Sequence, residues 1–504
     1  MAPDVTEHDV AEEGGTRQSL GRRAARGATV TAASQGARIL LQVAAVAVLA
    51  RLVPPAEYGL VAMVAAVVGI GEILRDAGLS SAAMRAPGLT RQQRDNLFWV
   101  NVAIGAVLCV ACFAAAPLIA RLFDEPALTG ICRALAFVFL VNGLATQHKA
   151  GLVREMRFRT LAVVEVAAPV VALGAAIAVG VATHDHRAVV VQQVATAAVT
   201  LAGVWVAGRW LPARPRRGAG TRGFFRFGGG LLGSQLVGYG ADNLATFVIG
   251  LSLGPGPLGL YNRAYHLLMR PLTQLRQPST TVALPVLARL ADEPARFDRM
   301  LLRGQQVLAL PVVLVLAVVV GASDVVVGVF LGPGWESAAP LLAAFAVAGG
   351  CQTLAYVGYW TYLARGLSGT LLAYSLVTAV LKIAGVLIGS FWGVNGIAAG
   401  FAASALLEWP LSFWWLSRVT SYPGGRLALG GLRILAQALP VGLAAWLAAS
   451  LPAAGAAGSP VTGLLLAIAS AVLVWALCLL VAPPLRRDAV LLVEVLRAVR
   501  SRAR

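Results

Sequence analysis

The sequence predicts an all-α integral membrane protein with about fourteen transmembrane helices, and three observations support this prediction. Of the 504 residues, 58% are apolar and only 13% are charged, whereas soluble globular proteins carry about 25% charged residues. Long apolar segments recur along almost the whole chain. Basic residues gather in every second connection between these segments. Together these features exclude an ordinary soluble enzyme.

The apolar segments are long enough to cross a membrane, which requires about 20 mostly apolar residues for roughly 30 Å of hydrocarbon. Some of them are separated only by short connections with Pro and Gly, such as 53–58 and 254–259. The fourteen predicted spans are 28–50, 59–77, 97–120, 128–148, 161–182, 188–208, 227–252, 260–284, 304–330, 338–362, 369–390, 394–416, 434–451 and 460–482.

The placement of the 41 Lys and Arg residues predicts the topology, because cytoplasmic loops are enriched in positive charge. The two tails and the even-numbered connections hold 32 of them when Arg75, at the end of the second span, is counted with the connection that follows it; the odd-numbered connections hold 3, and the remaining 6 lie within the spans. This alternation predicts that both termini are cytoplasmic. The net charge of +18 then reflects topology, so nucleic acid is not an expected partner.

An internal repeat appears when the sequence is shifted by 200 residues: Gln35 aligns with Gln235, Pro55 with Pro255, and Gly59 with Gly259. An even number of spans between the repeats would give them the same orientation, which places a substrate path between two lobes. We therefore expect two pseudo-symmetric six-helix lobes followed by two C-terminal helices. The predicted parts are a disordered cytoplasmic tail (1–27), an N-lobe (28–208), a basic cytoplasmic linker (209–226), a C-lobe (227–417), two extra helices (434–482) and a basic cytoplasmic tail (485–504).

Polar side chains form stripes with helical spacing on the first, seventh and eighth spans. The stripe residues that we expect to contact substrate are Gln35, Arg38, Gln42, Gln235, Asp242, Arg263, His266, Arg270 and Gln274. Ionisable groups within a bilayer usually face a bundle interior or an aqueous cavity. Guanidinium groups grip phosphate oxygens in a bidentate manner. The stripes thus predict a positive, hydrated cavity for an anionic head group such as a pyrophosphate.

Other interpretations of these residues remain open at this stage. Arg263 and Arg270 could pair with Glu72, Asp76 or Asp242 and only lock helices together. Arg263 and Arg276 lie nearer the helix ends, so they could instead extend to the membrane interface. Glu72, Asp242 and Glu408 are candidates for coupling transport to protons or sodium ions. The His184-Asp-His186 sequence is more typical of a solvated turn than of a metal site.

Motifs for catalysis or nucleotide hydrolysis are not convincing in this sequence. The stretch Gly250-Leu-Ser-Leu-Gly254 matches a nucleophile elbow, but it ends an apolar helix and has no α/β sheet around it. The sequence contains no Walker A or HExxH motif. We therefore expect a protein that is not an enzyme and needs neither a cofactor nor a metal.

Four local strings are the basis of a family resemblance. They are Arg51-Leu-Val-Pro-Pro-Ala-Glu-Tyr-Gly-Leu60, Leu258-Gly-Leu-Tyr-Asn-Arg-Ala-Tyr-His-Leu-Leu268, Phe330-Leu-Gly-Pro-Gly-Trp-Glu-Ser-Ala-Ala-Pro340 and Gly393-Val-Asn-Gly-Ile-Ala-Ala-Gly400. With the repeat and the spans, the chain resembles the polysaccharide transporter (Wzx-like lipopolysaccharide and exopolysaccharide flippase) family. This family belongs to the multidrug/oligosaccharidyl-lipid/polysaccharide flippase superfamily. The resemblance covers roughly residues 28–484.

The resemblance implies a V-shaped pair of lobes in a bacterial plasma membrane. It implies alternating access that moves an undecaprenyl-diphosphate-linked oligosaccharide from the cytoplasmic to the outer leaflet, with rocking about the turns near Pro55 and Pro255. Membrane lipids, a polysaccharide polymerase and glycosyltransferases are the implied partners. Two alternatives stay open: a peptidoglycan lipid-precursor flippase and a cation-coupled small-molecule exporter of the same superfamily.

Overall fold

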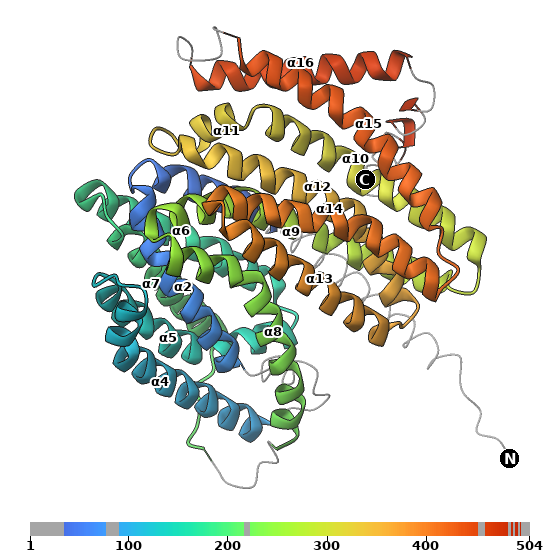
Figure 1. Ribbon diagram of the computed structural model, residues 1–504. Helices are drawn as coiled ribbons and strands as arrows, with labels where there is room; N and C mark the ends of the chain where they lie inside the picture. The colour runs from blue at the N-terminus through green and yellow to red at the C-terminus, as the bar shows by residue number, and fades with distance from the viewer. Residues whose placement is uncertain are drawn as a thin grey trace, which may run out of the picture. The chain divides into compact units, whose positions relative to one another are not determined.

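The structure is a computed structural model that describes residues 35–76, 90–215, 222–451, 459–481, 485–486, 489–491 and 494. Within these ranges the side chains are described except at 222–234 and 237. All regular structure in the described ranges is helical (Figure 1), which confirms the predicted all-α class. The predicted tail 1–27 and most of the predicted tail 485–504 lie outside the described residues.

Helices follow one another along the chain with short connections. After a first helix, Gln35–Ala50, they are α2 (Pro55–Asp76), α4 (Arg91–Leu122), α5 (Leu128–Arg154), α6 (Phe158–Thr183), α7 (Arg187–Gly208), α8 (Arg222–Ser252), α9 (Pro255–Arg289), α10 (Pro294–Gly321), α11 (Ser323–Phe330), the short 3₁₀ helix η1 (Glu336–Ala338), α12 (Ala339–Ala364), α13 (Ser368–Ser390), α14 (Gly393–Val419), α15 (Gly424–Ala449) and α16 (Pro460–Val481).

Every predicted span coincides with helix in the described residues, and eleven helices there are long and apolar enough to cross a membrane. The first helix, α8 and α9 are not among the eleven, so the number fourteen stays a prediction. Helix α9 is not among them because of its composition. This helix carries three internal prolines and four arginines, which are Arg263, Arg270, Arg276 and Arg289.

One predicted span is wrong in detail. Residues 304–330 were expected to form a single helix, but the helix breaks at Ala322 and continues as α11. At this break Gly321 lies against the backbone of α15, where a Cβ atom would overlap the carbonyl oxygen of Gly442. The close approach of α15 requires a residue without a side chain at the end of α10.

The chain forms two compact units that do not follow chain order. The first unit comprises Met1–Ala45, Val67–Thr183 and Arg187–Gly238, and the second comprises Val46–Ala66, His184–His186 and Tyr239–Arg504. The predicted lobe boundaries are not tested by this grouping and stay a prediction. In the first unit α4 packs on α5, and α7 packs on both α5 and α6. In the second, α12 is central and packs on α9, α10 and α14, while α15 packs on α10 and α16 (Figure 1).

Small residues allow close helix packing in the second unit. Gly385 and Gly389 of α13 face Gly400 and Gly396 of α14, and a Cβ atom at any of these positions would overlap backbone atoms of the facing helix. Gly396 and Gly400 thus form a helix contact of the small-xxx-small type.

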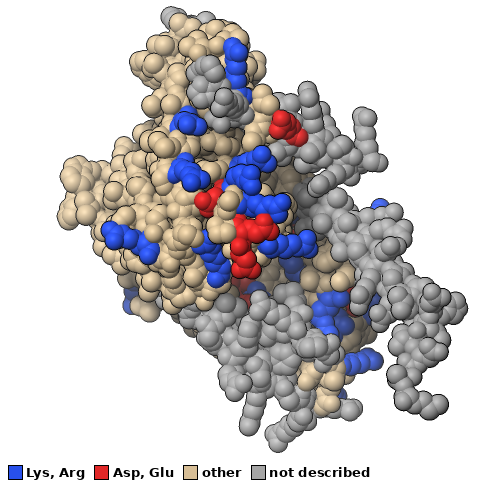
Figure 2. Space-filling model, turned by 90° about the vertical axis from the view of Figure 1, so that its right-hand side faces the viewer, with Lys and Arg blue, Asp and Glu red and all other residues tan. Residues whose placement is uncertain are grey.

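The surface of the described residues has a membrane protein's distribution of charge. Large apolar side chains are widely exposed, for example Val206 (80%), Phe391 (86%) and Val481 (83%). Figure 2 shows one face on which Lys and Arg side chains gather around a few Asp and Glu side chains, while most of the other described surface is uncharged. Exposed apolar area on this scale is not compatible with a water-soluble monomer.

Candidate substrate-binding residues

The cationic stripe on α9 belongs to the second unit and begins with Arg263. This side chain is only 9% exposed, and its guanidinium carbon lies 3.3 Å from the centre of the Tyr58 ring. The Nε atom of Arg263 is buried and has no hydrogen-bond partner among the described residues. A guanidinium stacked on a ring leaves its edge N–H groups available to an acceptor in its own plane.

The sequence left two other interpretations of the α9 arginines open, which were extension to the membrane interface and pairing with carboxylates; the structure supports neither. Both Arg263 and Arg276 are buried, the latter with 7% exposure, so extension to the membrane interface is wrong for both. Arg276 donates to the amide oxygen of Gln352 at 3.4 Å. Within the described residues neither Arg263 nor Arg270 has an ion-pair partner, so carboxylate pairing does not account for them.

The remaining stripe residues of the second unit differ in exposure. His266 and Gln274 are half-buried, whereas Arg270 and Asp242 are exposed. The nearby Tyr239 donates its hydroxyl to the carbonyl oxygen of Ala66 at 3.0 Å, which fixes α8 beside α2 at this level.

Glu408, a predicted coupling residue, lies on α14. Its Oε2 atom is buried without a hydrogen-bond partner among the described residues. It interacts electrostatically with Arg276.

Among the stripe residues of the first unit, Arg38 forms an ion pair. Arg38 donates to Glu165 at 3.2 Å, and the same carboxylate accepts from the Lys149 ammonium at 2.7 Å. Gln35, Gln42 and Gln235 are half-buried.

Glu72, the second predicted coupling residue, has partners as well. It accepts from the Arg75 guanidinium at 2.9 Å and from the Asn142 amide at 3.2 Å. Both carboxylates, Glu72 and Glu165, are therefore already hydrogen-bonded within the first unit.

The two copies of the sequence repeat meet in the second unit. A Cβ atom at Gly59 would overlap the carbonyl oxygen of Pro255, and a Cβ atom at Gly259 would overlap the carbonyl oxygen of Pro55. The contact is reciprocal, as a local two-fold axis between the repeats requires. We call these four residues, together with Tyr58, Arg263 and Trp335, the repeat junction.

The string 330–340 contributes Trp335 to the repeat junction. Trp335 is 1% exposed, donates its indole N–H to the carbonyl oxygen of Ala50 at 2.8 Å and packs edge-on against Tyr58 with ring centres 5.8 Å apart. The Arg51 guanidinium donates to the carbonyl oxygen of Val329 at 2.7 Å. Three of the four strings quoted from the sequence therefore lie side by side. No sequence pattern indicates a role for Tyr58 or Trp335, although both occur within those strings.

The turn with the two histidines also lies in the second unit. The His186 ring Nδ1 lies 2.6 Å from the Glu57 carboxylate, and the His186 backbone N–H donates to the same oxygen at 3.0 Å. The His side chain thus has a carboxylate partner on α2. Among the described residues no group of three or more His, Cys, Asp or Glu side chains could hold a metal ion.

These features define a multi-pass membrane protein with a transporter fold. The lipid II flippase MurJ in an inward closed conformation is similar over 89% of this chain and 97% of its own, with a TM-score of 0.68 and 12% identity. A multidrug resistance transporter of the MATE family in an inward-facing conformation is similar over 79% of this chain and 95% of its own, with a TM-score of 0.59 and 16% identity.

Sequence comparison gives the family. Residues 48–340 match the family described as "Polysaccharide biosynthesis protein", to which the chain therefore belongs. The teichuronic acid biosynthesis protein TuaB of Bacillus subtilis is 28% identical over 64% of this chain and 68% of its own length. The lipopolysaccharide biosynthesis protein WzxC of Escherichia coli is 24% identical over 73% of this chain and 75% of its own. The predicted family is confirmed.

Proposed function

We propose that this protein translocates a polyprenyl-diphosphate-linked oligosaccharide from the cytoplasmic to the outer leaflet of a bacterial plasma membrane by alternating access. Family membership and relatives that act in polysaccharide biosynthesis support this proposal. One such relative is the succinoglycan biosynthesis transport protein ExoT of Rhizobium meliloti, which is 24% identical over 70% of this chain and 72% of its own.

The single observation that carries the proposal is the state of Arg263. A buried guanidinium without an ion-pair partner among the described residues is costly, and the ring of Tyr58 compensates only part of this cost. A diphosphate would supply the missing acceptors, since Arg binds phosphate oxygens through parallel hydrogen bonds. Arg270, two helical turns along α9 and exposed, would bind the same head group.

The repeat junction suggests how the conformational change takes place. At Gly59 and Gly259 the two helices touch through glycine and a proline carbonyl, and the side-chain contact beside this crossing is the stack of Arg263 on Tyr58, so a turn of one helix against the other would change that stack. We propose that the crossing of α2 and α9 at Gly59 and Gly259 is the pivot of the alternating-access motion. The lipid tail would remain in the bilayer throughout, because only the polar head group is costly to move through hydrocarbon.

The test is a deletion strain complemented with variants. We expect lipid-linked oligosaccharide to accumulate on the inner leaflet and surface polysaccharide to disappear, and we expect the intact gene to reverse both effects. The Arg263→Ala/Arg270→Ala double variant should fail to complement at normal membrane abundance. Arg299→Ala, an exposed arginine of α10, is the matched control and should complement fully.

A peptidoglycan lipid-precursor flippase is the second candidate, favoured by the similarity to the MurJ fold. Its substrate presents the same diphosphate to Arg263. The deletion strain separates the two functions: loss of viability with arrested wall synthesis would indicate the peptidoglycan precursor, and a viable strain without surface polysaccharide would indicate the polysaccharide precursor. Normal polysaccharide with new sensitivity to cationic drugs would overturn both in favour of an exporter.

A further inference from the structure

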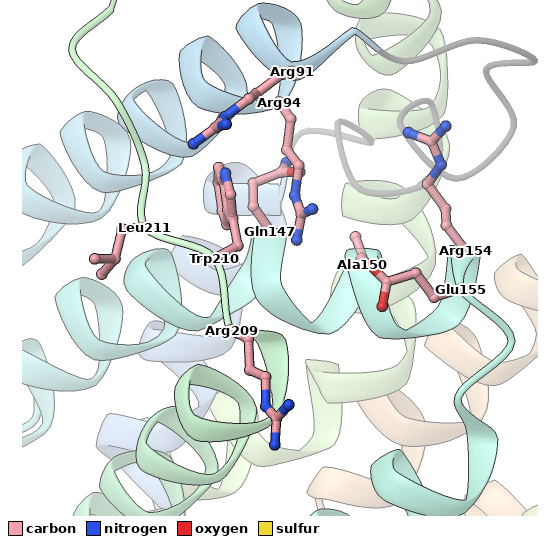
Figure 3. Close-up of a pocket in the computed structure, with 10 residues that line it drawn as sticks. Arg91, Arg94, Gln147, Ala150, Arg154, Glu155, Arg209, Trp210 and Leu211 are labelled. Atoms are coloured by element: carbon pink, nitrogen blue, oxygen red, sulfur yellow. The ribbon is translucent and has the colours of Figure 1, made fainter.

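A second basic site lies within the first unit, away from the α9 stripe. It is a pocket of about 570 Å³ between the start of α4, the end of α5 and the segment that follows α7 (Figure 3). This volume is in the range of about 300–1,000 Å³ that is usual for small-molecule sites. The pocket's polar and aromatic lining includes Arg91, Arg94, Gln147, Arg154, Arg209 and Trp210.

Positive charge dominates the pocket. Four arginines line it, and Glu155 is its single lining carboxylate. That carboxylate already lies 3.6 Å from the Arg157 guanidinium. Asp95 follows Arg94 in the sequence but does not line the pocket. Glu155 also attracts Arg94, but four arginines against one carboxylate leave the pocket with an excess of positive charge.

Arg94 is at the centre of the pocket. In Figure 3 its guanidinium lies beside Gln147 and Trp210, while the head groups of the other three arginines point away from it at the rim of the pocket. Its guanidinium carbon is 4.0 Å from the centre of a Trp210 ring. As at Tyr58, stacking leaves the edge of the guanidinium for a ligand.

Three buried N–H donors of the pocket have no acceptor among the described residues. They are the Arg94 Nε, the Gln147 Nε2 and the Trp210 Nε1 atoms. Gln147 is only 1% exposed, although it lines the pocket. Buried polar groups are almost always hydrogen-bonded. Three unsatisfied donors and an excess of cations around one cavity indicate a ligand that is anionic and rich in acceptors.

A helix cap and a hydrogen bond fix the segments that line the pocket. Thr90 and Gln93 form a reciprocal capping box at the start of α4, which sets the positions of Arg91 and Arg94. The Trp99 indole donates to the carbonyl oxygen of Ala213 at 2.8 Å, which ties the segment after α7 to α4.

The Trp210 side of the pocket is held in place too. The His148 ring lies 3.2 Å from the Trp210 carbonyl oxygen and stacks on Trp205 with ring centres 4.8 Å apart. Arg209 has a φ of 45°. Residues other than glycine rarely adopt this left-handed backbone conformation, and they keep it only where the surrounding structure enforces it.

We propose that this pocket binds a phosphate group, held by Arg94 with Gln147 and Trp210 and attracted by the surrounding arginines. The charge pattern of the sequence predicts that all three of its segments lie on the cytoplasmic side, where anionic lipids line the membrane surface. Tryptophans are enriched at that interface, and Trp210 lines the pocket. The phosphate is that of an anionic lipid head group or a soluble phosphate, and the experiment distinguishes the two sources. The inference does not depend on the proposed flippase function.

The experiment uses the full chain, purified in detergent and titrated separately with phosphatidylglycerol and with inorganic pyrophosphate. Bound lipid is counted by native mass spectrometry, and binding of either probe is followed by thermal unfolding. We expect Arg94→Gln to weaken binding about tenfold, since a charge-assisted bidentate contact is lost. Trp210→Phe keeps the stacked ring and removes only the N–H, so it should weaken binding less.

Two further variants make the result decisive. Gln147→Leu removes the buried donor at nearly constant volume and should also weaken binding. Arg121→Gln, at the opposite end of α4 and exposed, is the matched control and should bind as the wild type does. Binding of phosphatidylglycerol alone identifies a lipid head-group site, and binding of pyrophosphate alone identifies a soluble phosphate. Wild-type protein that binds neither probe, or binding that is unchanged in both Arg94→Gln and Gln147→Leu, overturns the proposal.

Discussion

Gly59 lies directly against the carbonyl oxygen of Pro255, at a distance that leaves no room for a side chain. The corresponding pair, Gly259 and Pro55, makes the same contact in the opposite direction. These are the positions that align when the sequence is shifted by 200 residues. The repeat is therefore preserved in three dimensions as a reciprocal backbone contact between α2 and α9, each of which has its proline at the first helical position.

Alanine at either glycine tests how much this contact matters. Gly59→Ala and Gly259→Ala should each lower the unfolding temperature, because the added methyl meets backbone that cannot change rotamer. Overpacking of this kind costs about 1–3 kcal/mol. Gly256→Ala, one helical turn from Gly259 and with open space around it, is the control. Equal unfolding temperatures for all three variants would show that the two helices separate without cost.

The cation–π contact of Arg263 gives a second prediction. Tyr58→Phe should keep translocation near the wild-type level, because the ring that faces the guanidinium remains. Tyr58→Leu should reduce it, since a cation–π contact is worth about 0.5–2 kcal/mol. Arg263→Lys should reduce it further, because an ammonium lacks the planar set of donors. The measurement is surface polysaccharide in the complemented deletion strain at matched protein abundance. Full activity of Arg263→Lys would show that only the charge is needed.

Sequence reasoning predicted what depends on local periodicity and on repeated strings. Apolar segments long enough to cross a bilayer predicted the helices. The alignment of Pro55 with Pro255 under a shift of 200 residues identified residues that meet in the second unit. It could not predict that the ring of Tyr58 covers Arg263, because that contact joins residues about 200 positions apart on two different helices.

The basic pocket was not predicted for a similar reason. Each of its arginines was explained by membrane topology alone, since Arg91, Arg154 and Arg209 occur in three separate predicted cytoplasmic connections. They come together only because α5 packs on both α4 and α7. A signal was present in the sequence, since Trp210 directly follows Arg209, but such a pair has no meaning until the packing of the helices is known.

The shared carboxylate of the first unit gives a third prediction. Glu165 accepts from Arg38 and Lys149, whose side chains are 39% and 49% exposed. Each pair should therefore contribute no more than about 1 kcal/mol. Glu165→Gln should lower the unfolding temperature slightly by leaving two cations side by side, and Arg38→Gln in the same chain should restore part of the loss. A double-mutant cycle on the purified protein measures this coupling. A coupling of zero would mean that Arg38 is not held by Glu165 and is free to bind substrate.

The three carboxylates proposed for ion coupling should respond differently to neutralisation. Glu72 is held by Arg75 and Asn142, so Glu72→Gln should mainly reduce stability. Asp242 is exposed within the second unit, so Asp242→Asn should leave the protein folded and, if this carboxylate carries the coupling, remove the dependence of translocation on the ion gradient. Glu408→Gln should fall between the two, because its Oε2 atom is buried and interacts electrostatically with Arg276. The measurement is translocation of lipid-linked oligosaccharide in vesicles with an imposed proton or sodium gradient. Retained gradient dependence in Asp242→Asn would move the coupling role to Glu408, whose neutralisation should then abolish the dependence.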